Sequence, residues 1–248
     1  GIDQVYVLLF TVAKHYEIKL EDKESAKENY IFLAITLQKL IVRMQVCDKN
    51  YNRLDSIFSD CIELMKNSSS ITGIINKIKT EITTLTPDDV FEKYFEQFCP
   101  SENRISEFYC RHIENEMRRE NGNRNKVDRG LTVEHIIPQT LGDLSDWYGS
   151  VTVPADIAED FNLNIVQNIG NKALLYGDDN SSANNNNYKY KLDVYQNGKR
   201  GQNKGTPIST FKMIENVVNN YPTVFLHTEV LARAKLLAKY AVKIWCCS

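Results

Sequence analysis

Apolar residues recur at three- and four-residue spacing through the first part of the chain. The segments QVYVLLFTVAKHY, ENYIFLAITLQKLIVRMQV and YNRLDSIFSDCIELMKNSSS all carry this pattern, which is typical of amphipathic helices. The second segment is apolar around much of its circumference, so we expect it to be a central packing helix. Residues 1–98 are therefore predicted to form a helical domain.

Beyond residue 98 the pattern is mixed. ENRISEFYCRHIENEMRRENG is a further amphipathic helix, and the final helix, TEVLARAKLLAKYAVKIW, covers about 228–246. Between them, LTVEHI and NIGNKALLYG are short apolar runs typical of strands. We predict an α+β chain, mostly helical, with a two-stranded antiparallel hairpin. Residues 99–248 form its second domain, whose core lies at about 131–195.

An asparagine-rich tract, DDNSSANNNNYKYKLDVYQNG, follows the second strand. Its low complexity alone favours a linker. Asn180, Asn184, Asn187, Lys191 and Tyr195 nevertheless stand at helical spacing, so they would share one face of a helix. We therefore expect a helix that starts at Asn180.

The charge distribution limits where nucleic acid could bind. The formal net charge of -2 gives no global signal for a nucleic-acid partner, so a binding surface must come from local charge. One cationic cluster precedes the first strand but is interspersed with acids. A second cluster has almost no acid, which suits contact with a DNA backbone better; it comprises Lys189, Lys191, Lys199, Arg200 and Lys204.

Several classes of protein are disfavoured. The six cysteines include no C-x-x-C pair, which argues against a structural zinc site. No apolar run approaches the length of a membrane span and no signal peptide is evident, so we expect a cytoplasmic protein. The chain opens at Gly1-Ile2 without an initiator methionine, from which we expect neighbouring domains to be missing.

Polar residues stand at the ends of the predicted elements. His135 ends the first strand, Asn171 begins the second, and Asn180 starts the helix. The stretches VEHIIPQT and GNKALLYGDDN, with Asn171 and Asn180 nine residues apart, resemble the motifs of the ββα-metal module of HNH endonucleases. Asn180 stands where the classical motif has its second histidine.

A closer resemblance includes more of the chain. The EHIxPQ run, the G-N-x-x-L-L strand, the N…(F/Y)-x-x-K pattern with Tyr188 and Lys191, and a final helix with Arg233 and Ile244-Trp245 are similar to the C-terminal domain of GmrSD-type modification-dependent restriction enzymes. The resemblance implies a bacterial anti-phage endonuclease. Residues 1–98 would connect it to an N-terminal nucleotide-binding sensor domain that this chain lacks, and this part would hold no nucleotide site.

Phosphodiester hydrolysis suggests a role for each residue. A neutral His135 would take a proton from water. Glu134 and the Asn180 carbonyl would be ligands of Mg²⁺ or Mn²⁺, and Asn171 would tie the loop between the motifs by hydrogen bonds. Asn184 and Asn187 are candidates for supporting groups, and Lys191 for holding a phosphate.

One geometric difficulty concerns Glu134 and His135. Neighbours in a strand point to opposite faces, so the two can converge on one metal only where the strand ends or bends. Pro138 is consistent with such an ending.

The expected partner is DNA, with modified bases or a phosphorothioate backbone as candidate modifications. An HNH site cuts one strand, so a double-strand break would need two copies, for example in a homodimer. Two alternatives stay open at this point: a nuclease-like module that binds DNA or a partner protein without catalysis, and a phosphodiesterase that acts on RNA.

Overall fold

The computed structural model describes residues 2–17, 24–67, 70–123, 125–127, 131–141, 144–198 and 211–246. The chain divides into two compact units, residues 1–94 with 245–248, and residues 95–244. It is mostly helical with one two-stranded antiparallel sheet, which confirms the predicted fold class. None of the described helices is long and apolar enough to cross a membrane.

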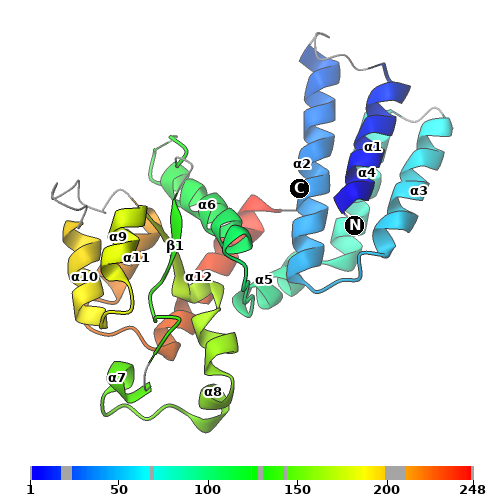
Figure 1. Ribbon diagram of the computed structural model, residues 1–248. Helices are drawn as coiled ribbons and strands as arrows, with labels where there is room; N and C mark the ends of the chain where they lie inside the picture. The colour runs from blue at the N-terminus through cyan, green and yellow to red at the C-terminus, as the bar shows by residue number, and fades with distance from the viewer. Residues whose placement is uncertain are drawn as a thin grey trace. The chain divides into compact units, whose positions relative to one another are not determined.

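The first unit is built from helices that run side by side (Figure 1). Ser70 is the N-cap of the helix that begins at Ile71. Its side chain accepts a hydrogen bond from the Gly73 backbone N–H at 3.3 Å. Such a cap satisfies a donor that the helix leaves unpaired. The helices are α1 (Ile2–His15), α2 (Glu24–Val46), α3 (Arg53–Lys66) and α4 (Ile71–Leu85), and α5 (Asp88–Glu96) follows them.

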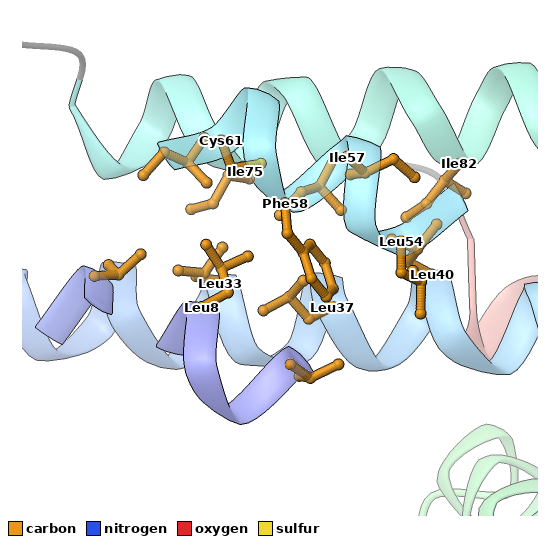
Figure 2. Packing of buried hydrophobic residues seen from close by; sticks show 14 of the residues in the cluster. Leu8, Leu33, Leu37, Leu40, Leu54, Ile57, Phe58, Cys61, Ile75 and Ile82 are labelled. Carbon is orange, nitrogen blue, oxygen red and sulfur yellow. The ribbon is translucent and has the colours of Figure 1, made fainter. Parts of the chain in front are cut away.

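The core of this unit lies between α1, α2, α3 and α4. Leu33 and Leu37 of α2 are fully buried, and Figure 2 shows them beside Leu8 of α1 and Phe58 of α3. The prediction that α2 is a central packing helix holds only for the face that packs into this core. Its other side exposes apolar residues, among them Ile35, which is 43% exposed.

The second unit contains the sheet and the helices that surround it. Its elements are α6 (Asn103–Glu120), β1 (Thr132–His135), α7 (Leu144–Tyr148), α8 (Ala155–Glu159), the π-helical turn η1 (Asn162–Val166), the 3-10 turn η2 (Ile169–Asn171), β2 (Lys172–Leu175), α9 (Gly177–Ala183), α10 (Tyr188–Asn197), α11 (Lys212–Asn220) and α12 (His227–Ile244). The helix α6 packs against both strands, α9 packs against β1, and α12 packs against η2 (Figure 1).

The two strands are short and pair in one antiparallel register. Thr132 pairs with Leu175 at one end, and His135 pairs with Lys172 at the other. All four residues of β2 are buried. A buried strand with so few ladder bonds needs support from neighbouring elements.

Arg233 of α12 supplies part of this support. Its Nη1 donates to the backbone oxygens of Gly170 at 2.6 Å and of Lys172 at 2.7 Å. The side chain is fully buried, so these bonds satisfy carbonyl groups that water cannot reach. Arg233 thereby attaches the last helix to the segment that carries Asn171.

Gly170 is needed because α12 approaches the backbone closely at this point. A Cβ on Gly170 would lie 2.1 Å from the backbone oxygen of Val230 and 2.8 Å from the backbone nitrogen of Ala234. Both atoms belong to a helix backbone, which cannot move aside as a flexible side chain would. The close contact between η2 and α12 therefore depends on the absence of a side chain.

We predict that Gly170→Ala destabilises the protein by about 3 kcal/mol or more, because overpacking a core commonly costs about 1–3 kcal/mol and backbone here cannot yield. Gly177→Ala is the matched control, since a Cβ there meets nothing within 4 Å. Urea-induced unfolding of both variants tests this. Equal free energies of unfolding would contradict the proposed close contact.

Candidate active site

The amide of Asn171 joins the segment that follows β1 to the segment that precedes β2. Its Oδ1 accepts from the backbone N–H of Ile137 at 2.7 Å. Its Nδ2 donates to the backbone oxygens of Ile137 and Val166, each at 2.9 Å. The Asn171 backbone oxygen also accepts from the Ile136 N–H at 2.9 Å. The buried amide thus uses its donor and acceptor groups on backbone, and it fixes the chain immediately after His135.

His135 is the last residue of β1 and only 7% exposed. Burial, the largest cause, and the positive charges of Lys172 and Lys191 together lower the pKa of its imidazole to about 4, although an interaction with the Gln167 side chain opposes them. The ring is therefore neutral at pH 7, and a neutral imidazole has a lone pair that can accept a proton.

His135 opens onto a polar pocket of about 230 Å³. The Nε2 of the ring lies 3.3 Å from the Nε2 of Gln139, which also lines the pocket. Asn180 of α9 also lines the pocket, and its Nδ2 donates to the Val133 backbone oxygen at 3.3 Å. The pocket thus brings together four of the predicted site residues, Glu134, His135, Asn180 and Asn184. Its full lining is Val133, Glu134, His135, Pro138, Gln139, Asn180, Ser181, Asn184 and Asn185.

Glu134 is held by two residues of α10. Its Oε1 accepts from the Lys191 Nζ at 2.7 Å and from the Tyr195 hydroxyl at 2.6 Å. Lys191 also donates to the His135 backbone oxygen at 2.7 Å. Burial raises the pKa of Glu134, although Lys191 opposes this shift, and burial lowers the pKa of Lys191. The pair gives each buried charge a partner, which a buried charge requires.

This arrangement corrects the expected phosphate contact of Lys191. The side chain is fully buried, so its ammonium group has no surface with which to contact DNA. Among the other cations of that cluster, Lys189 is exposed on α10. Lys199, Arg200 and Lys204 lie outside the described residues.

The asparagine tract forms two helices, so the expected single helix with one polar face was wrong. The first, α9, ends at Ala183, and the next residue, Asn184, has a φ of 38° that departs from helical geometry. The second, α10, begins after Asn187, whose side chain accepts from the Tyr190 N–H at 3.0 Å. Asparagine is favoured in both places, because it tolerates a left-handed backbone and caps helices well. Asn184 lines the pocket, whereas Asn187 caps α10.

The structure adds residues that the sequence pattern did not single out for the site. Gln139 stands within the EHIxPQ run, and Tyr195 is four residues after Lys191, so both had a signal in the sequence. Lys172 and Gln167 had none. Lys172 is the first residue of β2, and Gln167 follows η1. Their contacts form only in the folded chain, where the Lys172 Nζ is bonded to Ser106 of α6 at 2.9 Å and to Gln167 at 3.1 Å.

Comparison with known proteins identifies the family of the chain. The family described as GmrSD restriction endonucleases, C-terminal domain, matches residues 85–224, which is more than half of the chain. The chain belongs to this family. Neither a search of curated proteins nor one of solved structures found a match. The predicted resemblance is thus confirmed, and this GmrSD C-terminal domain is a nuclease module of a restriction endonuclease.

The donor atoms of the GmrSD C-terminal domain fit a hard divalent cation. Among the described residues, no three His, Cys, Asp or Glu side chains gather into a metal cluster. The residues that line the pocket instead include one acid, Glu134, and Asn180, whose amide donates through Nδ2 and leaves Oδ1 as its acceptor. Mg²⁺ commonly binds through one or two carboxylates and keeps several waters or phosphate oxygens, so this sparse oxygen set suits it.

We predict that Lys191→Met destabilises the GmrSD C-terminal domain by about 3–5 kcal/mol, because it leaves Glu134 buried without its cation. Lys189→Met on the same helix is exposed and should change the free energy of unfolding by less than about 0.5 kcal/mol. Urea-induced unfolding measures both.

A double variant, Glu134→Gln with Lys191→Met, should recover part of the loss, since neither charge is then left unpaired. A double variant no more stable than Lys191→Met alone would show that the charge pair is not the cause.

Proposed function

We propose that this chain hydrolyses phosphodiester bonds of DNA at an HNH-type, ββα-metal site, with His135 as the general base. One observation supports this above the others. A neutral imidazole faces a polar pocket that also contains Glu134 and Asn180, and all three are carried by a short hairpin and the helix that follows it. A module that only binds DNA has no need of this combination.

In this mechanism His135 takes the proton from the attacking water as the water oxygen approaches phosphorus. A general base must be unprotonated before the step, and burial beside Lys172 and Lys191 keeps the ring so. The same surroundings disfavour a positive charge on the ring. The proton must therefore be transferred quickly from His135 to solvent or to the leaving oxygen. The open pocket gives water access for that transfer.

Asn171 has a structural part in the step. It is not among the residues that line the pocket, and it acts through the backbone of Ile137. By fixing that backbone it sets the direction in which the strand presents His135.

Glu134 and Asn180 would hold Mg²⁺ or Mn²⁺. When bound, the ion would neutralise charge on the phosphate and stabilise the leaving 3′ oxygen. The Lys191 and Tyr195 bonds to Glu134 Oε1 fix the carboxylate in one orientation. Asn184 and Ser181 line the same pocket and can contact water or phosphate there.

We extend the proposal to the partners. Lys189, Lys199, Arg200 and Lys204 would contact the phosphate backbone of DNA. A separate nucleotide-binding domain would recognise modified bases or a phosphorothioate backbone. Since each site cuts one strand, a double-strand break would require two copies acting together. The protein would work in the bacterial cytoplasm, where such DNA is met.

We predict that the purified chain nicks supercoiled plasmid with Mg²⁺ or Mn²⁺ but not with EDTA. His135→Ala should lower the rate by at least about 100-fold, the lower range for loss of a general base. His15→Ala removes an exposed imidazole of α1 and should leave the rate unchanged. Undiminished nicking by His135→Ala would overturn the assignment. An RNA substrate of the same sequence, tested in parallel, decides between DNA and RNA.

We predict that replacing Lys189, Lys199, Arg200 and Lys204 together by alanine weakens DNA binding. Each phosphate contact contributes about 0.9 to the magnitude of the slope of log affinity against log salt. If each of the four residues makes one contact, the magnitude of the slope should decrease by about 3–4. A control with equal charge replaces Lys14, Arg53, Lys66 and Lys93, which are exposed. Equal slopes for the two quadruple variants would contradict the proposed DNA-binding cluster.

A further inference from the structure

Another cavity lies beside the candidate active-site pocket. It has a volume of about 440 Å³ and shares Pro138 and Gln139 with that pocket. Its other walls come from Leu141 and from the segment 158–166, which runs from the end of α8 through η1. We call this cavity the side pocket. Because the two pockets share a wall, a group bound in the side pocket would lie next to a phosphate held beside His135.

Asn171 holds the side pocket in a fixed relation to the active-site pocket. Its amide bonds both backbone groups of Ile137, which directly precedes the shared residue Pro138. The same amide donates to the backbone oxygen of Val166 at 2.9 Å, and Val166 lines the side pocket. One buried side chain thus ties the shared wall to the wall that η1 supplies.

The turn η1 places an exposed apolar side chain at the side pocket. It is a π-helical turn, in which the Gln167 backbone N–H donates to the Asn162 backbone oxygen at 3.0 Å. Such turns are rare and occur frequently at functional sites. Val166 of this turn is buried, whereas Leu163 is 63% exposed. Leu163 is therefore available to contact a ligand and is not needed to fill the core.

The charges of the side pocket disfavour a phosphate group as its ligand. Glu159 and Asp160 line it, both are exposed, and none of the described lining residues is Lys, Arg or His. Carboxylates repel a phosphate anion. The remaining walls are largely apolar and include Leu141, Phe161 and Leu163. This combination suits an uncharged group with an apolar surface and hydrogen-bond donors.

A nucleobase has both of these properties. Its face stacks on protein side chains, and the edge of adenine or cytosine carries an amino group that can donate to a carboxylate. A base reaches a protein pocket only when it has left the base stack. The base nearest to the side pocket would belong to the nucleotide next to the phosphate in the active-site pocket.

We propose that the side pocket binds an unstacked base with an exocyclic amino group, in the nucleotide next to the phosphate that is cut. Leu163 contacts the face of the base, and Glu159 and Asp160 accept hydrogen bonds from its edge. The chain should then prefer single-stranded or locally unpaired DNA to regular duplex, because extraction of a base from a duplex costs free energy. The inference rests on the proposed function for the position of the phosphate, but its main test needs no cleavage.

The test measures binding of short oligonucleotides to the full chain in EDTA. One probe is a pentanucleotide backbone of abasic residues, and the other has a single central adenine. The adenine should strengthen binding about five-fold or more, the lower range for a base that stacks on a protein side chain. Leu163→Ala should remove most of this gain. Leu231→Ala is the matched control, since Leu231 of α12 is also exposed and does not line the side pocket.

The carboxylates have a readout of their own. Hypoxanthine has a carbonyl oxygen where adenine has its amino group, so the wild type should bind the adenine probe about five-fold or more tightly than a hypoxanthine probe. Glu159→Gln combined with Asp160→Asn should abolish this preference. The two probes have the same backbone, so any change in the general attraction for phosphate cancels in their ratio.

Equal binding of the abasic and adenine probes by the wild type would overturn the inference, and so would an undiminished adenine gain in Leu163→Ala. Nicking assays separate this inference from the proposed function. A chain that shows the adenine gain but cuts neither DNA nor RNA would sink the proposed function and leave the side pocket standing. A chain that nicks plasmid through His135 but shows no adenine gain would do the reverse.

Discussion

The geometry of this domain depends on buried polar side chains that satisfy backbone groups around a very short hairpin. The strands β1 and β2 have four residues each and are far apart in the sequence, so neither ladder bonds nor a tight turn can hold them alone. Asn171 joins the segment after His135 to the segment before β2. Arg233 attaches the same segment to α12, and Gly170 allows that helix to approach. Since leaving such groups unpaired costs about 1–3 kcal/mol each, these side chains decide where the end of β1 lies, and therefore where His135 lies.

The same polar interior sets the charge state of the site. Lys172 and Lys191 are both fully buried, and each lowers the pKa of His135. Each cation is itself satisfied: Lys191 by Glu134 and the His135 backbone oxygen, and Lys172 by Ser106 and Gln167. The hairpin is thus flanked by two positive charges that solvent does not screen effectively. Such charges stabilise an anion nearby and keep the imidazole neutral, but they also oppose the imidazolium that a general base forms.

The sequence predicted much of this, and the failures have a physical pattern. The long amphipathic helices, the two strands and the position of His135 at the end of β1 were local signals, readable from periodicity and motif spacing. Two boundaries differ from the prediction: Asn171 directly precedes β2, and Asn180 lies within α9, which starts at Gly177. The asparagine tract was misjudged because helical spacing alone cannot distinguish one helix from two when asparagine both ends and starts helices. Lys191 was assigned to phosphate because it shares the predicted helical face with the asparagines and belongs to a cationic cluster with almost no acid, whereas its real partner, Glu134, is 57 residues away. Gln167 and Lys172 could not be found at all, since their roles come only from the meeting of α6, η1 and β2.

The alternation of side chains along β1 bears on how an ion would be held. Glu134 and His135 are neighbours in a strand and therefore begin on opposite faces. In the structure, one carboxylate oxygen of Glu134 is engaged by Lys191 and Tyr195 of α10, while His135 ends the strand beside the pocket. A carboxylate that already neutralises a lysine has little net charge left to offer a cation, and Asn180 has none. A site of this kind should bind Mg²⁺ weakly by itself and more firmly when phosphate oxygens complete the coordination. Metal and DNA would then bind cooperatively, so that the hydrolytic site is assembled only on its substrate.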